Sequence, residues 1–221
     1  MTWIKICGTT NLDDARAAVD AGADAVGFLF APSPRRIAPE QARDIIAALP
    51  RHPEKVGVFA NESPERICEI VEQAGLTAVQ LHGDEPPDFP AALARVPGRI
   101  SRARFRLFKA LSVAPGFESE LRAFAESGVD ALVLDSVRHA EGPRGGTGQA
   151  FDWNRAQDFM PAIARHVRII VAGGLDPENV AEAVRLLRPW GVDVCTGVER
   201  EPGKKDHDKL RAFVAAVRSV K

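Results

Sequence analysis

Long apolar runs and a surplus of either charge are both missing from this chain. No stretch approaches the ~18 consecutive apolar residues that a membrane-spanning helix needs. The first residues do not combine a basic stretch with an apolar run, so no signal peptide is predicted. The formal net charge of -1 gives no clustered basic excess for nucleic acid or an anionic membrane. We therefore expect neither a nucleic-acid nor a membrane partner.

Cysteine is scarce as well, with only Cys7, Cys68 and Cys195. An odd number argues against a disulfide framework, and the spacing matches no zinc or redox motif. Cys68 lies in a helical pattern beside Ile67 and Val71, where packing is its expected role. These features favour a reducing cytoplasm and predict no metal site.

Short apolar runs that alternate with helical periodicity are what the sequence does contain. The 221 residues, 45% hydrophobic and 27% charged, fit one α/β domain over residues 1–221. Strict alternation implies parallel strands, in either a closed barrel or a doubly wound open sheet. The eight predicted strands are Trp3–Cys7, Ala25–Phe30, Lys55–Phe59, Ala78–Leu81, Arg106–Ala110, Ala131–Asp135, Arg168–Ala172 and Val192–Cys195.

An internal repeat decides between these two folds. Similar strings begin at Gly22, Gly75, Gly128 and Gly191, each read as a glycine that ends a helix and leads into a strand. The first two intervals are equal, and the third is longer by an insertion in the glycine-rich stretch after the sixth strand. Every second strand is thus entered in the same way. Four such modules predict a single (β/α)₈ TIM barrel.

Cys7 and Asp135 close the first and sixth predicted strands, at the end where such barrels place their chemistry. Strand alternation points Cys7 into the barrel, where a thiolate can act as a base or nucleophile. Position alone is equally compatible with a small buried apolar side chain. For Asp135 the alternative is a helix cap, but the next predicted helix begins near Trp153, too far away.

Glycine-rich turns follow the last three predicted strands. Backbone amides of such turns can approach an anion closely, and turns after strands 7 and 8 are the usual phosphate site of this fold. Three of them predict a phosphorylated ligand. The candidate phosphate-binding residues are Gly145, Gly146, Thr147, Gly148, Gly173, Gly174, Cys195, Thr196 and Gly197.

Other polar residues are candidates for binding the substrate. The loop after the second strand contains Arg35 and Arg36, and an arginine there is either a carboxylate clamp or a solvated surface residue. Gln80 and His82 point inward from strand 4, and His82 is either a proton shuttle or a hydrogen-bonded residue of the barrel mouth. Asp193 is the fourth candidate.

Buried charges near the first and last strands are expected to pair. Lys5 and Asp193 each lie two residues before a cysteine that ends a strand, and these strands are neighbours in a closed barrel. Neither charge can be buried alone without a large cost, so an ion pair beneath the site is predicted. Lys109, inward on the fifth strand, is expected to support Asp135 in the same way.

Taken together, the motifs resemble those of the phosphoribosylanthranilate isomerase family, in order over nearly the whole chain. The matching stretches are Lys5–Gly8, Gly22–Phe28, Val79–Gly83, Leu134–Asp135, Gly145–Gly148, Gly173–Leu175, Pro177–Val180, Gly197–Glu199 and Pro202–His207. One departure stands out: Cys195 and Thr196 occupy positions where the family commonly has two serines.

The resemblance implies an Amadori rearrangement of N-(5-phosphoribosyl)anthranilate in tryptophan biosynthesis. In this scheme Asp135 protonates the furanose ring oxygen, and Cys7 then removes the proton from the sugar C2. Arg36 falls where the family places an arginine that meets the anthranilate carboxylate. No redox cofactor is implied, and the expected oligomeric state is a monomer, with a homodimer as the other possibility. Two alternatives stay open: another phosphosugar-binding barrel isomerase, or an idle ligand-binding barrel.

Overall fold

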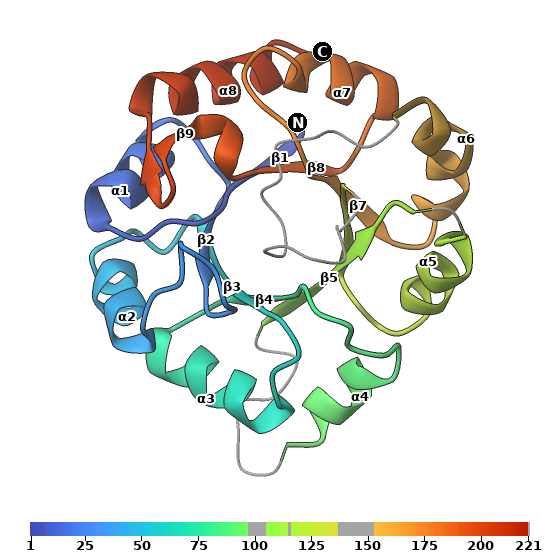
Figure 1. Ribbon diagram of the computed structural model, residues 1–221, viewed down its shortest axis with the longest axis horizontal. Coiled ribbons are helices and arrows are strands. Elements are labelled where there is room, and N and C mark those ends of the chain that lie inside the picture. Colours follow the sequence, from blue (N-terminus) through green and yellow to red (C-terminus); the bar gives the residue numbers. More distant parts are fainter. Residues whose placement is uncertain (97–104, 115, 137–152, 221) are drawn as a thin grey trace.

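Eight parallel strands close into a barrel in a computed structural model, which describes residues 1–96, 105–114, 116–136 and 153–220 (Figure 1). The strands pair in chain order, and the last pairs with the first. This closure confirms the predicted barrel. The strands are β1 (Trp3–Ile6), β2 (Ala25–Leu29), β3 (Glu54–Phe59), β4 (Ala78–Leu81), β5 (Arg106–Ser112), β6 (Ala131–Asp135), β7 (Arg168–Val171) and β8 (Gly191–Val194).

Helices form a ring outside the strands (Figure 1). Their apolar faces pack against the outer face of the barrel, which gives the larger of two hydrophobic cores. They are α1 (Leu12–Asp20), α2 (Pro39–Ala47), α3 (Pro64–Ala74), α4 (Phe89–Ala94), α5 (Glu118–Ala125), α6 (Trp153–Ile163), α7 (Val180–Leu187) and α8 (His207–Ser219). After β8, the 3₁₀ turn η2 (Thr196–Val198) leads into a hairpin of β9 (Glu199–Glu201) and β10 (Lys204–Lys205).

A second, smaller core fills the inside of the barrel. Its members are alanines, β-branched residues and aromatic residues, and include Trp3, Val56, Phe108 and Ile170. Trp3 contacts Phe108 edge-on and stacks on Trp190 at a centroid distance of 5.0 Å. This packing fills the inside at the amino ends of the strands, where Arg106 and Glu54 form a half-buried ion pair at 3.0 Å, and the polar pocket lies at the carboxyl ends.

The repeated glycines play two different structural roles. Gly22, Gly75 and Gly128 adopt positive φ angles of 94°, 75° and 86°, as expected for residues that end helices. Gly191 does not, and here the predicted role is wrong, because Arg188 takes the left-handed conformation after α7. A Cβ atom at Gly191 would lie 2.8 Å from the Trp3 ring, so this glycine lets β8 approach that indole.

Within the described ranges, no helix has the length and hydropathy of a membrane span. The same ranges contain no group of three or more His, Cys, Asp or Glu side chains arranged to hold a metal ion.

Candidate active site

A pocket of about 740 Å³, measured out to its opening, lies at the carboxyl ends of the strands. Its lining includes Cys7 and Asp135 on different walls, with Gln80, His82 and Asp193 between them. The structure therefore brings together residues that lie far apart in the chain.

The thiol wall is formed where β1 meets β8. Cys7 is buried, and its Sγ shares a hydrogen bond with Cys195, which is half-buried. This bond and burial raise the pKa of Cys7 well above its ordinary value, against the opposing charge of Lys5. The same bond, with the cations of Lys205 and Arg35, lowers the pKa of Cys195 to about 7 despite its burial.

Lys5 and Asp193 form the predicted ion pair beneath Cys7. They are register partners on β1 and β8, and Lys5 Nζ lies 2.6 Å from Asp193 Oδ2. Burial alone would lower the pKa of Lys5, but the negative charge of Asp193 holds it above its ordinary value, so the ammonium stays charged. Asp193 Oδ1 is buried without a hydrogen-bond partner among the described residues, which leaves one acceptor at the pocket.

Asp135 forms the opposite wall, at the end of β6. Its Oδ2 lies 3.3 Å from His82 Nε2, and its Oδ1 accepts the backbone N–H of Ser136 at 2.7 Å. Burial would raise the pKa of this carboxyl, but the hydrogen bonds from His82 and Ser136 hold it below its ordinary value. Gly173, at φ 75°, packs so closely that a Cβ there would lie 2.6 Å from Asp135 Oδ1. Only a glycine turn fits beside this carboxylate.

A continuous line of hydrogen bonds joins the two walls. Lys5 Nζ donates to Gln80 Oε1 at 2.9 Å, and Gln80 Nε2 lies 3.1 Å from His82 Nδ1. The other ring nitrogen of His82 faces Asp135. Gln80 and His82 thus contact the residues around both Cys7 and Asp135.

Lys109 is not the support of Asp135 that the sequence suggested. Its Nζ forms a buried ion pair with Glu85 Oε2 at 2.8 Å and donates to the Gly83 carbonyl at 2.7 Å. Glu85 also accepts the backbone N–H groups of Gly83 and Asn61. The predicted inward orientation is wrong: Phe108 and Ala110 face the inner core, and Lys109 faces the helices, with its Nζ 5.4 Å from the centre of the Phe124 ring of α5. On that side it meets Glu85 and holds the backbone next to His82 instead.

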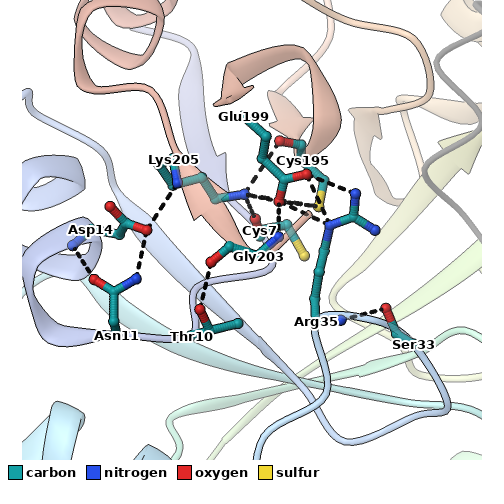
Figure 2. Close-up of polar contacts among 10 residues, drawn as sticks. All are labelled: Cys7, Thr10, Asn11, Asp14, Ser33, Arg35, Cys195, Glu199, Gly203 and Lys205. Carbon is teal, nitrogen blue, oxygen red and sulfur yellow. Dashed lines mark hydrogen bonds and ion pairs between the residues drawn. The ribbon is translucent and has the colours of Figure 1, made fainter. Parts of the chain in front are cut away.

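Arg36 is likewise corrected by the structure. Its side chain is exposed and does not line the pocket, whereas the neighbouring Arg35 is buried and does. Figure 2 shows Arg35 bound in a fork by Glu199, with an Nη2–Oε2 distance of 2.7 Å. These bonds raise the pKa of the guanidinium and keep it charged. The candidate clamp for a carboxylate is therefore Arg35.

Lys205, on the β9–β10 hairpin, completes this cluster (Figure 2). Its buried Nζ contacts Glu199 Oε1 at 2.9 Å and the backbone carbonyls of Cys7 and Cys195 at 2.5 and 3.3 Å. Burial would raise the pKa of Glu199, but Arg35 and Lys205 hold it below its ordinary value. The hairpin thus ties the ends of β1 and β8 to Arg35.

Only some of the candidate phosphate-binding residues line the pocket. Gly173, Gly174, Cys195 and Thr196 line the pocket. Gly197 does not line it, but its Cα packs on the Leu175 carbonyl so tightly that no Cβ fits. The remaining candidates, Gly145, Gly146, Thr147 and Gly148, lie outside the described residues.

Glu85, Glu199 and Lys205 are buried but were not assigned roles from the sequence, and the choice of Arg36 over Arg35 came from the family resemblance. Glu199 and Lys205 belong to the family motifs quoted above, but no function for either residue was deduced from those motifs. Charged residues in loops have no periodicity that reveals burial, and only their ion pairs in space do so.

The fold and the polar pocket define the class: an enzyme of the (β/α)₈-barrel type. A sequence model of the family described as "N-(5'phosphoribosyl)anthranilate (PRA) isomerase" matches residues 4–216. The chain belongs to this family and is an isomerase.

Several relatives of this family were found by sequence and by structure. The enzyme of that name from Pelobacter propionicus is 43% identical over 222 residues, covering 100% of this chain and 98% of the relative. A crystal structure of the Thermotoga maritima protein has a TM-score of 0.85 at 41% identity, with 99% of each chain covered.

Two further crystal structures bear on ligand and assembly. A phosphoribosylanthranilate isomerase in complex with reduced 1-(o-carboxyphenylamino)-1-deoxyribulose 5-phosphate has a TM-score of 0.81 at 39% identity, with 99% of each chain covered. Another describes monomers generated from the dimeric T. maritima enzyme. The monomeric state expected for this chain therefore stays a prediction.

Proposed function

We propose that this chain converts N-(5-phosphoribosyl)anthranilate to 1-(2-carboxyphenylamino)-1-deoxyribulose 5-phosphate in tryptophan biosynthesis, with Asp135 as the acid and Cys7 as the base. The observation that carries the proposal is that a buried carboxyl and a buried thiol line one pocket from opposite walls. The complex of a relative with a reduced form of this product supports the choice of substrate.

Ring opening is the first step. The bond between C1 and the ring oxygen breaks, its electron pair goes to that oxygen, and Asp135 supplies the proton. The nitrogen lone pair of the anthranilate group forms the C1–N double bond, which leaves an iminium cation. Substrate binding expels water from around Asp135, and the loss of solvation raises the pKa of the carboxyl toward the protonated form that this step requires.

Removal of the C2 proton is the second step. Cys7 takes this proton, the C2–H electron pair forms a C1–C2 double bond, and the iminium nitrogen is neutralised. The resulting enolamine becomes the ketone when C1 gains a proton and the C2 hydroxyl loses one. The C1 proton comes from solvent, and the proton of the C2 hydroxyl returns to it. Exchange with solvent also restores the proton that Asp135 gave and removes the one that Cys7 took, so the overall oxidation state is unchanged and no redox cofactor is needed.

Cys7 must be a thiolate for that second step, although the free protein holds it as a thiol. The iminium cation next to C2 favours the thiolate by its charge. Cys195, which is hydrogen-bonded to Cys7 and has a pKa of about 7, is placed to accept the thiol proton. We assign Cys195 this role in place of a direct phosphate contact.

Substrate anions and hydroxyls match the remaining polar groups of the pocket. Arg35, held by Glu199, is assigned to the anthranilate carboxylate. The turns at Gly173–Gly174 and Thr196–Gly197, with Gly145–Gly148, are assigned to the phosphate. The free Oδ1 of Asp193 is assigned to a sugar hydroxyl, because a buried carboxylate oxygen without a donor is costly.

Loss of the substrate's fluorescence in the purified protein tests the proposal directly. The wild-type chain should consume phosphoribosylanthranilate, and Cys7→Ser and Asp135→Asn should each reduce kcat by a factor of about 10² or more. Cys68→Ser, at a buried helix cysteine away from the pocket, is the matched control. Near-normal turnover in either pocket variant, with unchanged folding, would refute the assigned roles.

A further inference from the structure

The hydrogen-bond line between the two walls contains three residues that the reaction scheme does not use: Lys5, Gln80 and His82. Gln80 lies between Lys5 and His82, and its side chain is buried. We propose that Gln80 is a positioning residue, which holds His82 as the neutral tautomer with its proton on Nε2, aimed at Asp135. The catalytic consequence rests on the proposed role of Asp135, but the tautomer itself does not.

Lys5 sets the orientation of the Gln80 amide. An ammonium has three donors and no acceptor, so the atom 2.9 Å from Lys5 Nζ must be the carbonyl oxygen Oε1. Asp193 fixes Lys5 from the other side at 2.6 Å. The amide therefore cannot flip without placing its NH₂ group against a buried cation.

The orientation of Gln80 in turn sets the His82 ring. With Oε1 facing Lys5, the NH₂ group of Gln80 faces His82 Nδ1 at 3.1 Å. An NH₂ group only donates, so Nδ1 must present its lone pair. The proton of the neutral imidazole is then on Nε2, 3.3 Å from Asp135 Oδ2.

Other protonation states of the ring conflict with this line. A proton on Nδ1, either in the other tautomer or in the imidazolium, would face a donor whose direction Lys5 has fixed. The ionised Asp135 carboxylate has no proton to give to an unprotonated Nε2. Only the neutral Nε2–H form satisfies Lys5, Gln80, His82 and Asp135 together.

The backbone holds the ring in this place. The His82 N–H donates to the Phe59 carbonyl at 2.7 Å. The next residue, Gly83, donates to Glu85 and accepts from Lys109. A Cβ atom at Gly83 would collide with Asn61 and Glu85, so the chain after His82 is enclosed on all these sides. The ring therefore cannot easily turn away from Gln80.

It follows that His82 orients Asp135 but does not store its proton. A ring kept neutral by Gln80 donates one hydrogen bond to the carboxylate and has no second proton to release. The ammonium beneath Cys7 thus determines, through one amide, which hydrogen bond the acid on the opposite wall receives.

Nitrogen NMR of the histidine rings tests this inference without using activity. In ¹⁵N-labelled protein at neutral pH, long-range ¹H–¹⁵N spectra distinguish the two tautomers and the imidazolium. His82→Gln assigns the His82 signals among those of the 5 histidines. We expect the Nε2–H tautomer in the wild type. An Nδ1–H tautomer or an imidazolium would overturn the inference, even if the enzyme were fully active.

Two substitutions separate positioning from structure. Gln80→Leu should abolish the single tautomer and lower kcat about 10- to 100-fold, the range found for partners that orient a functional histidine. Gln80→Glu keeps the shape and the acceptor for Lys5, but its second oxygen should draw a proton onto Nδ1 and give an imidazolium. Gln157→Leu, at an exposed glutamine of α6, is the control and should change neither readout.

An unchanged His82 spectrum in folded Gln80→Leu would refute the role of Gln80. If instead the spectra respond as expected while Asp135→Asn stays active, the positioning of His82 stands and the acid assignment falls. The two proposals are therefore tested separately.

Discussion

The two ends of the barrel hold their charges differently: the Arg106–Glu54 ion pair at the amino ends is partly exposed, whereas the ion pairs at the carboxyl ends are buried. At the amino ends of the strands, Trp3 lies between Phe108 and Trp190, and Arg106 stacks over Trp190 at 4.8 Å. At the carboxyl ends, three buried lysines each pair with a carboxylate, in the pairs Lys5–Asp193, Lys109–Glu85 and Lys205–Glu199. The difference teaches that the stability of this barrel and its chemistry are located at opposite ends.

Buried ion pairs are poor sources of stability, because desolvation offsets most of their attraction. Aromatic packing has no such cost. The charges of the pocket end are therefore best explained by function, and the aromatic residues of the other end by folding.

The largest expected effect comes from breaking one of the buried pairs. Lys5→Met leaves Asp193 charged and unpaired, which should lower the free energy of unfolding by about 4 kcal/mol. The double variant Lys5→Met/Asp193→Leu should recover most of that loss while remaining inactive. Urea unfolding measures the first effect, and the fluorescence assay the second. A double variant as unstable as Lys5→Met would show that the pair itself stabilises the fold.

Removing Arg35 should affect substrate binding more than turnover. Arg35→Met deletes the guanidinium that is proposed to bind the anthranilate carboxylate, a contact worth about 2–3 kcal/mol, so KM should rise roughly 30- to 150-fold. Glu199 keeps Lys205 as a counterion, so stability should change less. Arg36→Met is the matched control, because that side chain is exposed. Equal effects of the two variants on KM would contradict the assignment of Arg35.

Trp190→Ala tests the other end of the barrel. It removes the stack on Trp3 and the contacts of Arg106 and Arg168 with the indole, at centroid distances of 4.8 and 5.0 Å. Because the side chain is only half-buried, we expect a loss of about 2 kcal/mol in the free energy of unfolding. At a temperature where the variant is folded, kcat/KM should match the wild type. A large loss of activity would show that the two ends are coupled.

The smallest change in the free energy of unfolding is expected from Cys195→Ser, whose main effect is on the protonation of Cys7. The hydrogen bond with Cys195 raises the pKa of Cys7, and a serine hydroxyl does not ionise in its place. The pKa of Cys7 should therefore fall, so its thiolate should form at lower pH. The rate of iodoacetamide labelling of Cys7, followed by peptide mass spectrometry as a function of pH, measures this shift. An unchanged or higher pKa would contradict the coupling between the thiols.

The barrel was predictable because strand alternation and the repeated entry glycines are regular along the sequence. The Lys5–Asp193 pair was predictable for the same reason, since both residues occupy equivalent positions in strands that must meet when a barrel closes. In regular strands the pairing register determines which side chains lie next to each other.

Loops have no pairing register, and the predictions for loop residues were wrong or were not made. Nothing periodic distinguishes Arg35 from Arg36, and the structure alone shows which of them is buried against Glu199. The partner of Lys109 is on the loop after β4, outside the strand pattern that suggested Asp135. Family motifs contained Glu199 and Lys205, but their function depends on a hairpin that folds back over β1.

The closure of β8 onto β1 also has a kinetic consequence. Lys5 and Asp193 are separated by 188 positions in the chain, so the loop that they close includes nearly every other contact of the fold. A chain lacking its last strand has an unneutralised Lys5 and an incomplete setting for Cys7. During refolding, activity should therefore return with the slowest productive phase. The return of activity then measures when the two ends of the polypeptide pair.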